Sequence, residues 1–124
     1  MNGMRDEKRP AVYILTSRKY GPLYIGVTSA LWNRVATHKA ESFKGFTEKY
    51  HIHQLVWYEH HQLMDAAIKR EKQLKKWNRA WKIKLIEKFN PAWRDLHDEI
   101  DFDHTLVQPE NEGFENEQKP TKGP

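Results

Sequence analysis

The sequence contains no cysteine. This absence excludes a disulfide framework, a thiolate metal site and a cysteine nucleophile, and it fits a reducing compartment. No apolar run approaches the roughly 20 residues of a membrane span. The first ten residues, MNGMRDEKRP, are charged, and no apolar segment of signal-peptide length follows them. We therefore expect a cytoplasmic protein without a membrane segment.

The charge of the chain is divided unevenly along its length. Residues 1–94 carry 19 Lys or Arg against 8 Asp or Glu, whereas residues 95–124 carry 2 against 9. A body with a net charge of +11 is expected to bind phosphate backbones with a strong dependence on salt. The acidic end has few large apolar residues and predicts a disordered tail. This tail either stays solvated or folds over the basic body and competes with a nucleic acid.

Two short segments rich in strand-forming residues, AVYILTS and PLYIGVT, are joined by a turn-like connection. They predict an antiparallel hairpin. Alternation places Val12 and Ile14 on one face of the first strand and Tyr13 on the other. In the second strand, Tyr24 and Gly26 lie opposite the aliphatic residues. If the aliphatic side faces the core, the two tyrosines lie together on the other side, and Gly26 leaves an open space beside Tyr24.

A helix is predicted after the hairpin, over the segment SALWNRVATHKAES. Thr28 or Ser29 can cap its N-terminus, because a hydroxyl accepts a hydrogen bond from a free backbone N–H there. Arg34 and His38 are four residues apart on this segment. They therefore lie one turn from each other on the same helix face.

The remainder of the basic body predicts a third strand and a long helical region. The strand covers residues 52–59, and the helical region extends from about 63 to 89 with a break near Asn78. Asn90–Pro91 ends this region, because proline cannot continue a helix and restricts the residue before it. The segment PAWRDLHDEI that follows can add a short last helix.

The stretch KREKQLKK, residues 69–76, contains one acid, Glu71, among five bases. Steps of three and four residues place this acid on the apolar stripe of the helical region. The stripe consists of Met64, Ala67, Glu71, Leu74, Asn78, Trp81 and Leu85. A carboxylate near a core must be neutralised, paired or bound to a metal. Glu71 is therefore either an inward-facing metal ligand or the partner of Lys75 in a surface ion pair.

These motifs, taken in order, resemble the GIY-YIG nuclease domain. The resemblance rests on Val12-Tyr13-Ile14 and Tyr24-Ile25-Gly26, followed by Arg34, His38 and Glu71. It implies an α+β fold, an α/β sandwich-like arrangement in which a small three-stranded antiparallel sheet is flanked by helices. It also implies metal-dependent cleavage of a DNA phosphodiester. We expect a flexible segment at 1–9, one nuclease-like domain at 10–95 and a disordered acidic tail at 96–124.

The resemblance implies a role for each matching residue. Tyr24 would activate the attacking water, and Tyr13 would line the site and help to position that water. Arg34 would stabilise the phosphate in the transition state, and His38 occupies a position held by His or Tyr in the family. Glu71 would bind the divalent metal, Mg²⁺ or Mn²⁺. A free tyrosine titrates near pH 10 and a free histidine near 6.5, so the choice of general base between Tyr24 and His38 stays open.

One position departs from the pattern of some family members, which have a lysine directly after YIG. Val27 stands there in this chain, which removes a positive charge from the site. Lys39 is a candidate replacement, but its position next to His38 points it elsewhere on the helix, so the role is not assigned to it. The basic side chains expected to contact nucleic acid are Lys39, Lys69, Arg70, Lys72, Lys75 and Lys76.

Other histidines and the tryptophans are expected to be structural. A zinc site is not expected at His51, His53, His60 and His61, because His60 and His61 are adjacent and point apart. The tryptophans are expected to pack in the core or near hinges, although an exposed one could stack on a base. They are Trp32, Trp57, Trp77, Trp81 and Trp93.

Three functions compete. The first is a small divalent-metal-dependent endonuclease on DNA. It would be selective for DNA structure or directed by a protein partner, because about 30 residues outside the domain are too few for a separate specificity domain. The second is a non-catalytic nucleic-acid-binding module that uses the same basic surface, and the third is an adaptor that binds a protein through the acidic tail. Whether RNA is also cut, the oligomeric state and the pathway stay open, with DNA repair, recombination and mobile-element defence as candidates.

Overall fold

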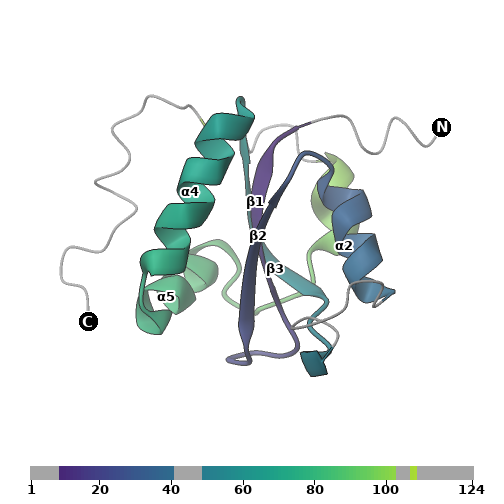
Figure 1. Ribbon diagram of the computed structural model, residues 1–124. Coiled ribbons are helices and arrows are strands. Elements are labelled where there is room, and N and C mark those ends of the chain that lie inside the picture. The colour runs from purple at the N-terminus through teal and green to yellow at the C-terminus, as the bar shows by residue number, and fades with distance from the viewer. Residues whose placement is uncertain (1–8, 41–48, 103–106, 109–124) are drawn as a thin grey trace.

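Three antiparallel strands form the centre of the structure, a computed structural model that describes residues 9–40, 49–102 and 107–108. β1 (Ala11–Thr16) lies between β2 (Leu23–Thr28) and β3 (Gln54–His61) and pairs with both (Figure 1). All six residues of β1 are buried. The expected three-stranded antiparallel sheet is confirmed, and the third strand begins two residues later than expected.

A fourth, short strand extends the sheet at the β3 edge. β4 (Val107–Gln108) pairs with β3 in parallel, so the strand order is β2-β1-β3-β4. The sequence did not predict this strand, because two residues give no alternation to detect.

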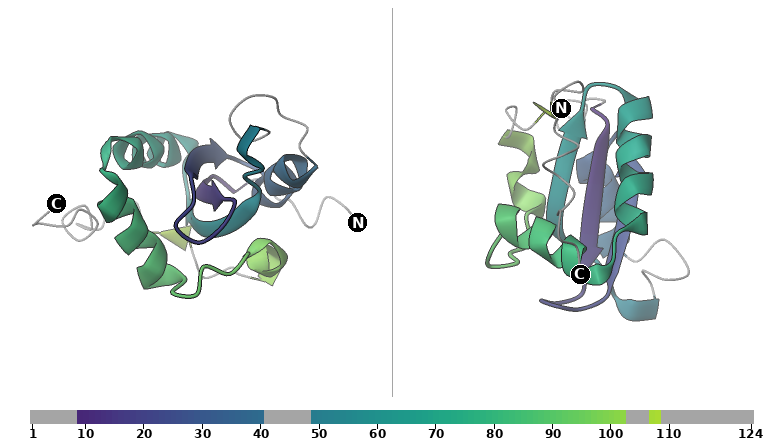
Figure 2. Two further views of the ribbon diagram at one scale, coloured as in Figure 1. Left: turned by 90° about the horizontal axis from the view of Figure 1, so that it is seen from below. Right: turned by 90° about the vertical axis from the view of Figure 1, so that its left-hand side faces the viewer.

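Helices cover both faces of the sheet and complete the expected α+β fold. α4 (Met64–Lys76) and α5 (Arg79–Phe89) lie on one side, and α2 (Leu31–Lys39) lies on the other with the 3₁₀ helix η1 (His97–Phe102) (Figures 1 and 2). The break between α4 and α5 falls near Asn78, as predicted, because the Asn78 side chain accepts a hydrogen bond from the backbone N–H of Trp81 and caps α5. None of the helices in the described part of the chain is long and apolar enough to cross a membrane.

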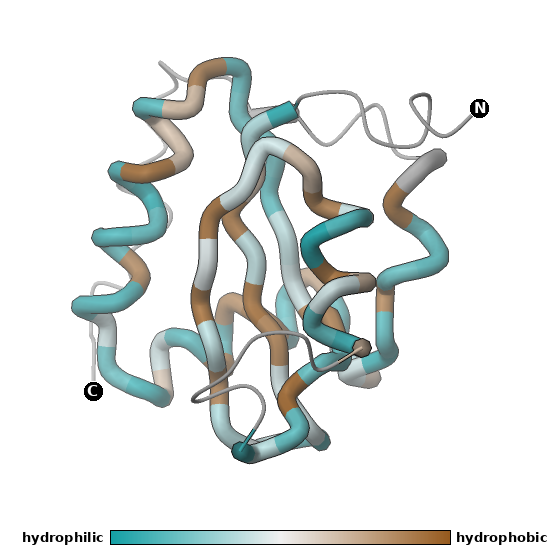
Figure 3. Tube along the Cα trace, turned by 45° about the vertical axis from the view of Figure 1, so that its right-hand side comes forward, coloured by the Kyte–Doolittle hydropathy of each residue, from teal (hydrophilic) through white to brown (hydrophobic). Residues whose placement is uncertain are grey.

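Each face of the sheet has its own hydrophobic core. On the α4 side, Val12 and Ile14 pack with Leu74 and other apolar residues. On the α2 side, Tyr13 packs with Val35. Hydrophobic residues are interspersed with hydrophilic ones along the strands and helices (Figure 3). The side of the hairpin opposite the aliphatic residues is therefore a second core side, and Tyr13 is only 1% exposed.

The folded domain extends beyond the boundary at residue 95 that the sequence indicated. Leu96 and Ile100 are buried in the core on the α2 side, and the backbone N–H of Leu96 donates to the carbonyl of Leu55 at 2.8 Å. The expected disordered tail therefore does not begin at residue 96. Its more distal residues lie mostly outside the described ones, as does the expected flexible segment at 1–9 apart from Arg9.

The predicted capping of α2 is wrong. The helix begins at Leu31, and its N-cap, Ala30, makes no side-chain capping bond. The hydroxyl of Thr28 instead accepts a hydrogen bond from the backbone N–H of Ala30 at 3.0 Å. Thr28 thus stabilises the turn between β2 and α2 and does not cap the helix.

Candidate active site

Two tyrosines of the hairpin and one histidine of α2 form an aromatic cluster. The ring centroids of Tyr13 and Tyr24 are 6.3 Å apart. The His38 ring lies 5.3 Å from Tyr24 and 6.1 Å from Tyr13. A hydrogen bond of 3.3 Å joins the Tyr13 hydroxyl to Nε2 of His38. The structure therefore brings Tyr13 and Tyr24 together on one side of the hairpin, as the alternation predicted.

Gly26 makes room for Tyr13. The two residues are direct partners across β1 and β2, and a Cβ atom on Gly26 would lie 2.5 Å from both Cζ and the hydroxyl oxygen of Tyr13. The expectation that Gly26 leaves an open space beside Tyr24 is thus wrong. The Tyr13 ring occupies this space, because it leans across β2 toward the cluster.

Two charged residues act on the cluster. Burial, followed by the neighbouring Tyr24, raises the pKa of Tyr13, while the positive charge of Arg34 lowers it and the negative charge of Glu71 raises it further. These effects show that Arg34 of α2 and Glu71 of α4 are close enough to act electrostatically on the same hydroxyl. The charges of Arg34 and Glu71 therefore act on the cluster that Tyr13, Tyr24 and His38 form by contact.

His38 is a buried residue with a strongly altered titration. Its exposure is only 3%. Burial, then the charge of Arg34, then that of His53, lower the pKa of His38 from 6.5 to about 4. The imidazole is therefore neutral at pH 7, and one of its nitrogens is already engaged by Tyr13.

Glu71 has the inward orientation expected under the first alternative and the ion-pair partner expected under the second. Its side chain is only 14% exposed, so it faces inward, and its Oε2 atom lies 2.8 Å from Nζ of Lys75, as in the expected ion pair. Lys75 is 54% exposed, so its side chain can leave the carboxylate without disturbing the core.

The donor atoms of this region suit a hard, hydrated cation. Among the described residues, no group of three or more His, Cys, Asp or Glu side chains is placed to hold a metal ion. A Mg²⁺ or Mn²⁺ ion does not need such a group, because it keeps several water ligands and binds through one or two carboxylates. The Glu71 carboxylate, with tyrosine hydroxyls nearby, fits this kind of site.

One of the expected nucleic-acid contacts, Arg70, is a core residue. It is 5% exposed, and its Nε atom donates to Oε1 of Glu59 at 3.0 Å. Its guanidinium also lies 5.9 Å from the ring centroid of Trp57 and 5.6 Å from that of Trp77. Arg70 therefore links α4 to β3 inside the protein and does not face a nucleic acid. The sequence did not indicate that Arg70 faces the core while its neighbours Lys69 and Lys72 face solvent.

Lys39 is also committed to the fold. Its Nζ atom donates to the carbonyl of His53 at 3.0 Å and pairs with Asp95. These contacts connect the end of α2 with the segment before β3 and with the chain after α5. This leaves the expected surface contacts to four lysines of α4, all of them exposed: Lys69, Lys72, Lys75 and Lys76.

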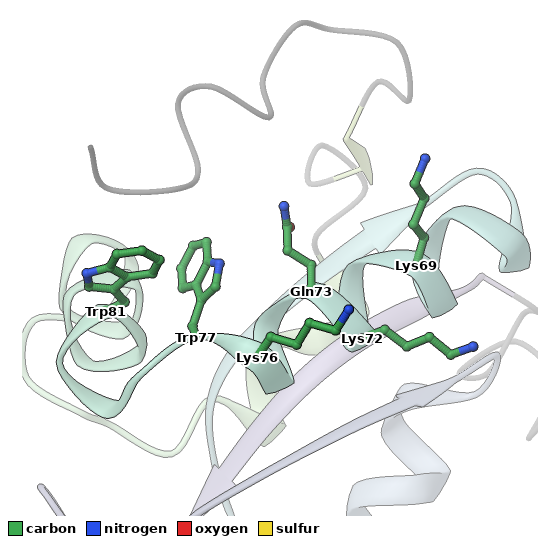
Figure 4. A pocket seen from close by; sticks show the side chains of 6 residues that line it. All are labelled: Lys69, Lys72, Gln73, Lys76, Trp77 and Trp81. Carbon is green, nitrogen blue, oxygen red and sulfur yellow. The ribbon is translucent and has the colours of Figure 1, made fainter. Parts of the chain in front are cut away.

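The sequence missed the feature that three of these lysines share. Lys69, Lys72 and Lys76 line an open groove of about 600 Å³ together with Gln73, Trp77 and Trp81 (Figure 4). The spacing of the two tryptophans by four residues could have indicated a shared surface, but the break between α4 and α5 interrupts that periodicity.

A comparison with protein families identifies the domain. The model of the GIY-YIG catalytic domain matches residues 9–84, more than half of the chain. The chain belongs to the GIY-YIG family. The matched region includes every residue of the candidate site: Tyr13, Tyr24, Arg34, His38 and Glu71. Membership of the GIY-YIG family indicates a nuclease domain that acts on DNA, in a family that generally uses divalent metals. Comparisons with curated proteins and with solved structures gave no match.

Proposed function

We propose that this GIY-YIG protein is a divalent-metal-dependent endonuclease that hydrolyses DNA phosphodiesters and is selective for DNA structure or directed by a partner. The observation that carries the proposal is the gathering of Tyr13, Tyr24 and His38 within reach of Arg34 and Glu71. Phosphodiester hydrolysis requires a group that activates water and charges that stabilise the phosphate in the transition state. This region supplies groups for both.

Glu71 would hold the metal, Mg²⁺ or Mn²⁺. When bound, the ion would supply neutralisation of the phosphate charge and a water of lowered pKa. Glu71 is suited to this role because it is inward-facing and its partner in the structure, Lys75, is largely exposed. Its other role, as the partner of the exposed Lys75 in an ion pair between residues four apart on the helix, would contribute little to stability, because such helix pairs contribute about 0.3–0.5 kcal/mol.

Arg34 would stabilise the phosphate. A guanidinium can donate two parallel hydrogen bonds to phosphate oxygens. The charge of Arg34 acts on Tyr13 and His38, which supports this role, because those groups would lie near the attacking water. A lysine at this position would act only as a point charge, so Arg34→Lys is expected to impair cleavage.

Tyr24 is the better candidate for the general base. A histidine with a pKa of about 4 binds a proton too weakly to remove one efficiently from water near neutral pH. His38 is also buried and bonded to Tyr13, whereas Tyr24 is partly exposed. We assign His38 and Tyr13 to orienting Tyr24 and the water, and Tyr24 to accepting the proton.

The test is cleavage of a panel of supercoiled, single-stranded, flapped and branched DNAs with Mg²⁺, Mn²⁺ or EDTA. We expect cleavage that requires a metal and is lost in Glu71→Ala, with one DNA structure preferred. Binding to all substrates without cleavage in any metal would instead support the non-catalytic nucleic-acid-binding module.

A further inference from the structure

The groove along α4 and the start of α5 has a wall of two tryptophans. The rings of Trp77 and Trp81 meet edge to face, with centroids 5.6 Å apart. Trp77 is buried against the guanidinium of Arg70, whereas Trp81 is partly exposed. Trp81 therefore offers an indole surface to a ligand, and Trp77 holds that surface in place.

The other lining residues offer hydrogen-bond donors and positive charge. Three ammonium groups border the groove, those of Lys69, Lys72 and Lys76 (Figure 4). Of the described residues that line it, none is acidic. This arrangement favours an anionic ligand that also has a flat apolar part.

Gln73 is oriented by the buried ion pair behind it. Nη1 of Arg70 donates to Oε1 of Gln73 at 2.5 Å, and Arg70 is itself held by Glu59. Because the amide oxygen is occupied, the amide nitrogen of Gln73 is the end that projects outward beside the lysines (Figure 4). The side chain therefore adds a fixed donor to the groove.

The groove lies on a different flank of α4 from the candidate active site. In an α-helix, two residues separated by two positions point about 200° apart around the axis, as Glu71 and Gln73 do. A strand in the groove would therefore cross the outer surface of α4 and would not occupy the cluster around Tyr13. It would contact the protein before or after the segment that is cut.

We propose that this groove binds a single strand of nucleic acid, with one base against Trp81 and neighbouring phosphates at Lys69, Lys72 and Lys76. Base stacking on an aromatic ring beside a positive channel is the common basis of single-strand binding. The bases of a duplex are stacked on each other, so an intact duplex would leave the indole unused. The volume of about 600 Å³ falls within the range of about 300–1,000 Å³ typical of ligand pockets.

The proposal deepens the proposed nuclease function by naming single-stranded segments, such as flaps or gaps, as part of the substrate. Binding in the groove does not itself require cleavage. The two proposals can therefore fail separately, and the experiment should be done in EDTA, where no metal-dependent cleavage occurs.

The test is fluorescence anisotropy of the full chain with three labelled probes of about ten nucleotides: oligo(dT), an abasic strand of equal length and a hairpin duplex. Wild type should bind oligo(dT) more tightly than both others. Trp81→Ala should lower the affinity for oligo(dT) about tenfold and leave that for the abasic strand unchanged. Trp81→Phe, which keeps a ring, should retain most of the preference and controls for folding defects.

Charge variants test the phosphate contacts separately. Lys69→Gln and Lys76→Gln should each reduce the slope of log K against log salt by about 0.7 for both single strands. Lys49→Gln removes the same charge from an exposed position outside the groove and should reduce it less. If Lys49→Gln reduces the slope of log K against log salt as much as Lys69→Gln and Lys76→Gln do, the assignment of phosphates to the groove is overturned.

Equal wild-type affinities for oligo(dT) and the abasic strand would overturn the proposal, and so would an unchanged preference in Trp81→Ala. Cleavage of DNA in Mg²⁺, without a preference for oligo(dT) over the abasic strand in EDTA, would support the nuclease function and contradict single-strand binding in the groove. A base preference that depends on Trp81, without cleavage in any metal, would support binding in the groove and contradict the nuclease function.

Discussion

The hydroxyl of Tyr13 lies 3.3 Å from Nε2 of His38, although 25 positions separate the two residues in the chain. The hydrogen bond joins β1 to α2 in the interior of the protein. It is accompanied by a low pKa for His38 and a raised pKa for Tyr13, so both groups are neutral at pH 7. A neutral pair can stay buried without a counter-ion and can fix the position of the more exposed Tyr24.

Protonation of His38 should therefore destabilise the fold. The folded pKa, about 4, lies below the ordinary value of 6.5, so between these values the unfolded chain binds the proton more readily. The stability is fully present above about pH 6.5 and is lost as the pH falls toward 4, by up to about 3 kcal/mol. The measurement is the free energy of unfolding in urea at pH 7, 6, 5 and 4.5.

His38→Gln should weaken this pH dependence without abolishing it, because burial also lowers the pKa of His97. His51→Asn removes an exposed histidine at a positive φ that asparagine tolerates, and should leave the dependence unchanged. An equal pH dependence in His38→Gln and wild type would show that His38 titrates normally in the folded protein.

The pH dependence of cleavage should separate the two candidate bases. If Tyr24 accepts the proton, kcat at saturating DNA and metal should rise from neutral toward alkaline pH, because a phenolate, and not a phenol, is a base strong enough to remove a proton from water. If His38 accepts it, kcat should already be at its plateau above about pH 5, given the pKa of about 4. Tyr24→Phe should remove the alkaline rise, and a flat profile in wild type would exclude the tyrosine.

Glu71 and Lys75 allow the metal site to be tested against the surface ion pair. Glu71→Ala should reduce kcat more than about a hundredfold, because metal binding contributes several kcal/mol to the transition state. It should change the free energy of unfolding by no more than about 1 kcal/mol. Cleavage rates at several Mg²⁺ concentrations, with urea unfolding, measure both effects.

Lys75→Ala is the matched control, because it breaks the same 2.8 Å ion pair and keeps the carboxylate. It should weaken DNA binding at low salt through the lost charge, while kcat at saturating DNA stays close to that of wild type. If Lys75→Ala lowers kcat as much as Glu71→Ala does, then the ion pair, and not a metal bound to Glu71, is what the site requires.

The sequence predicted the parts of the fold that follow from periodicity. The hairpin faces, the break at Asn78 and the inward direction of Glu71 depend on local spacing alone, and the structure agrees with each. The predictions for Gly26 and Arg70 were wrong because the decisive contacts come from elsewhere in the chain. The ring that fills the space at Gly26 comes from β1, and the carboxylate that holds Arg70 comes from β3.

Local spacing also could not show that residues after 95 belong to the domain. The acidic composition of that segment favoured a tail, yet Leu96 and Ile100 fill the core beside α2. Two apolar residues four apart are a weak signal in an acidic segment, and the core residues that they pack against come from β1, α2 and β3, earlier in the chain. Similarly, the groove at Trp81 needs the turn between α4 and α5, whose direction depends on tertiary packing.

Gly26→Ala tests the close contact with Tyr13. The added methyl group would lie 2.5 Å from two atoms of the Tyr13 ring system, so the ring must move. We expect a loss of about 1–3 kcal/mol in the free energy of unfolding. Combining it with Tyr13→Leu, which removes those two atoms, should give a loss smaller than the sum of the two single losses. Strict additivity in urea unfolding would show that Tyr13 and Gly26 are not in contact.

Arg70 should matter for stability far more than its exposed neighbour Lys69. Arg70→Met leaves Glu59, a carboxylate that is only 7% exposed, without its guanidinium partner. His61, 2.8 Å from the same carboxylate, supplies only part of the compensation, so we expect a loss of about 3 kcal/mol. Lys69→Met, on the exposed side of α4, should change the free energy of unfolding by less than about 0.5 kcal/mol.

The double variant Arg70→Met with Glu59→Gln shows whether the loss of stability comes from the unpaired carboxylate of Glu59. Glutamine fills the same space and carries no charge, so the double variant should be more stable than Arg70→Met alone. Gln73 loses its hydrogen bond from Arg70 in both variants, so this effect cancels in the comparison. If the double variant is no more stable than Arg70→Met, the unpaired charge of Glu59 is not the cause of the loss.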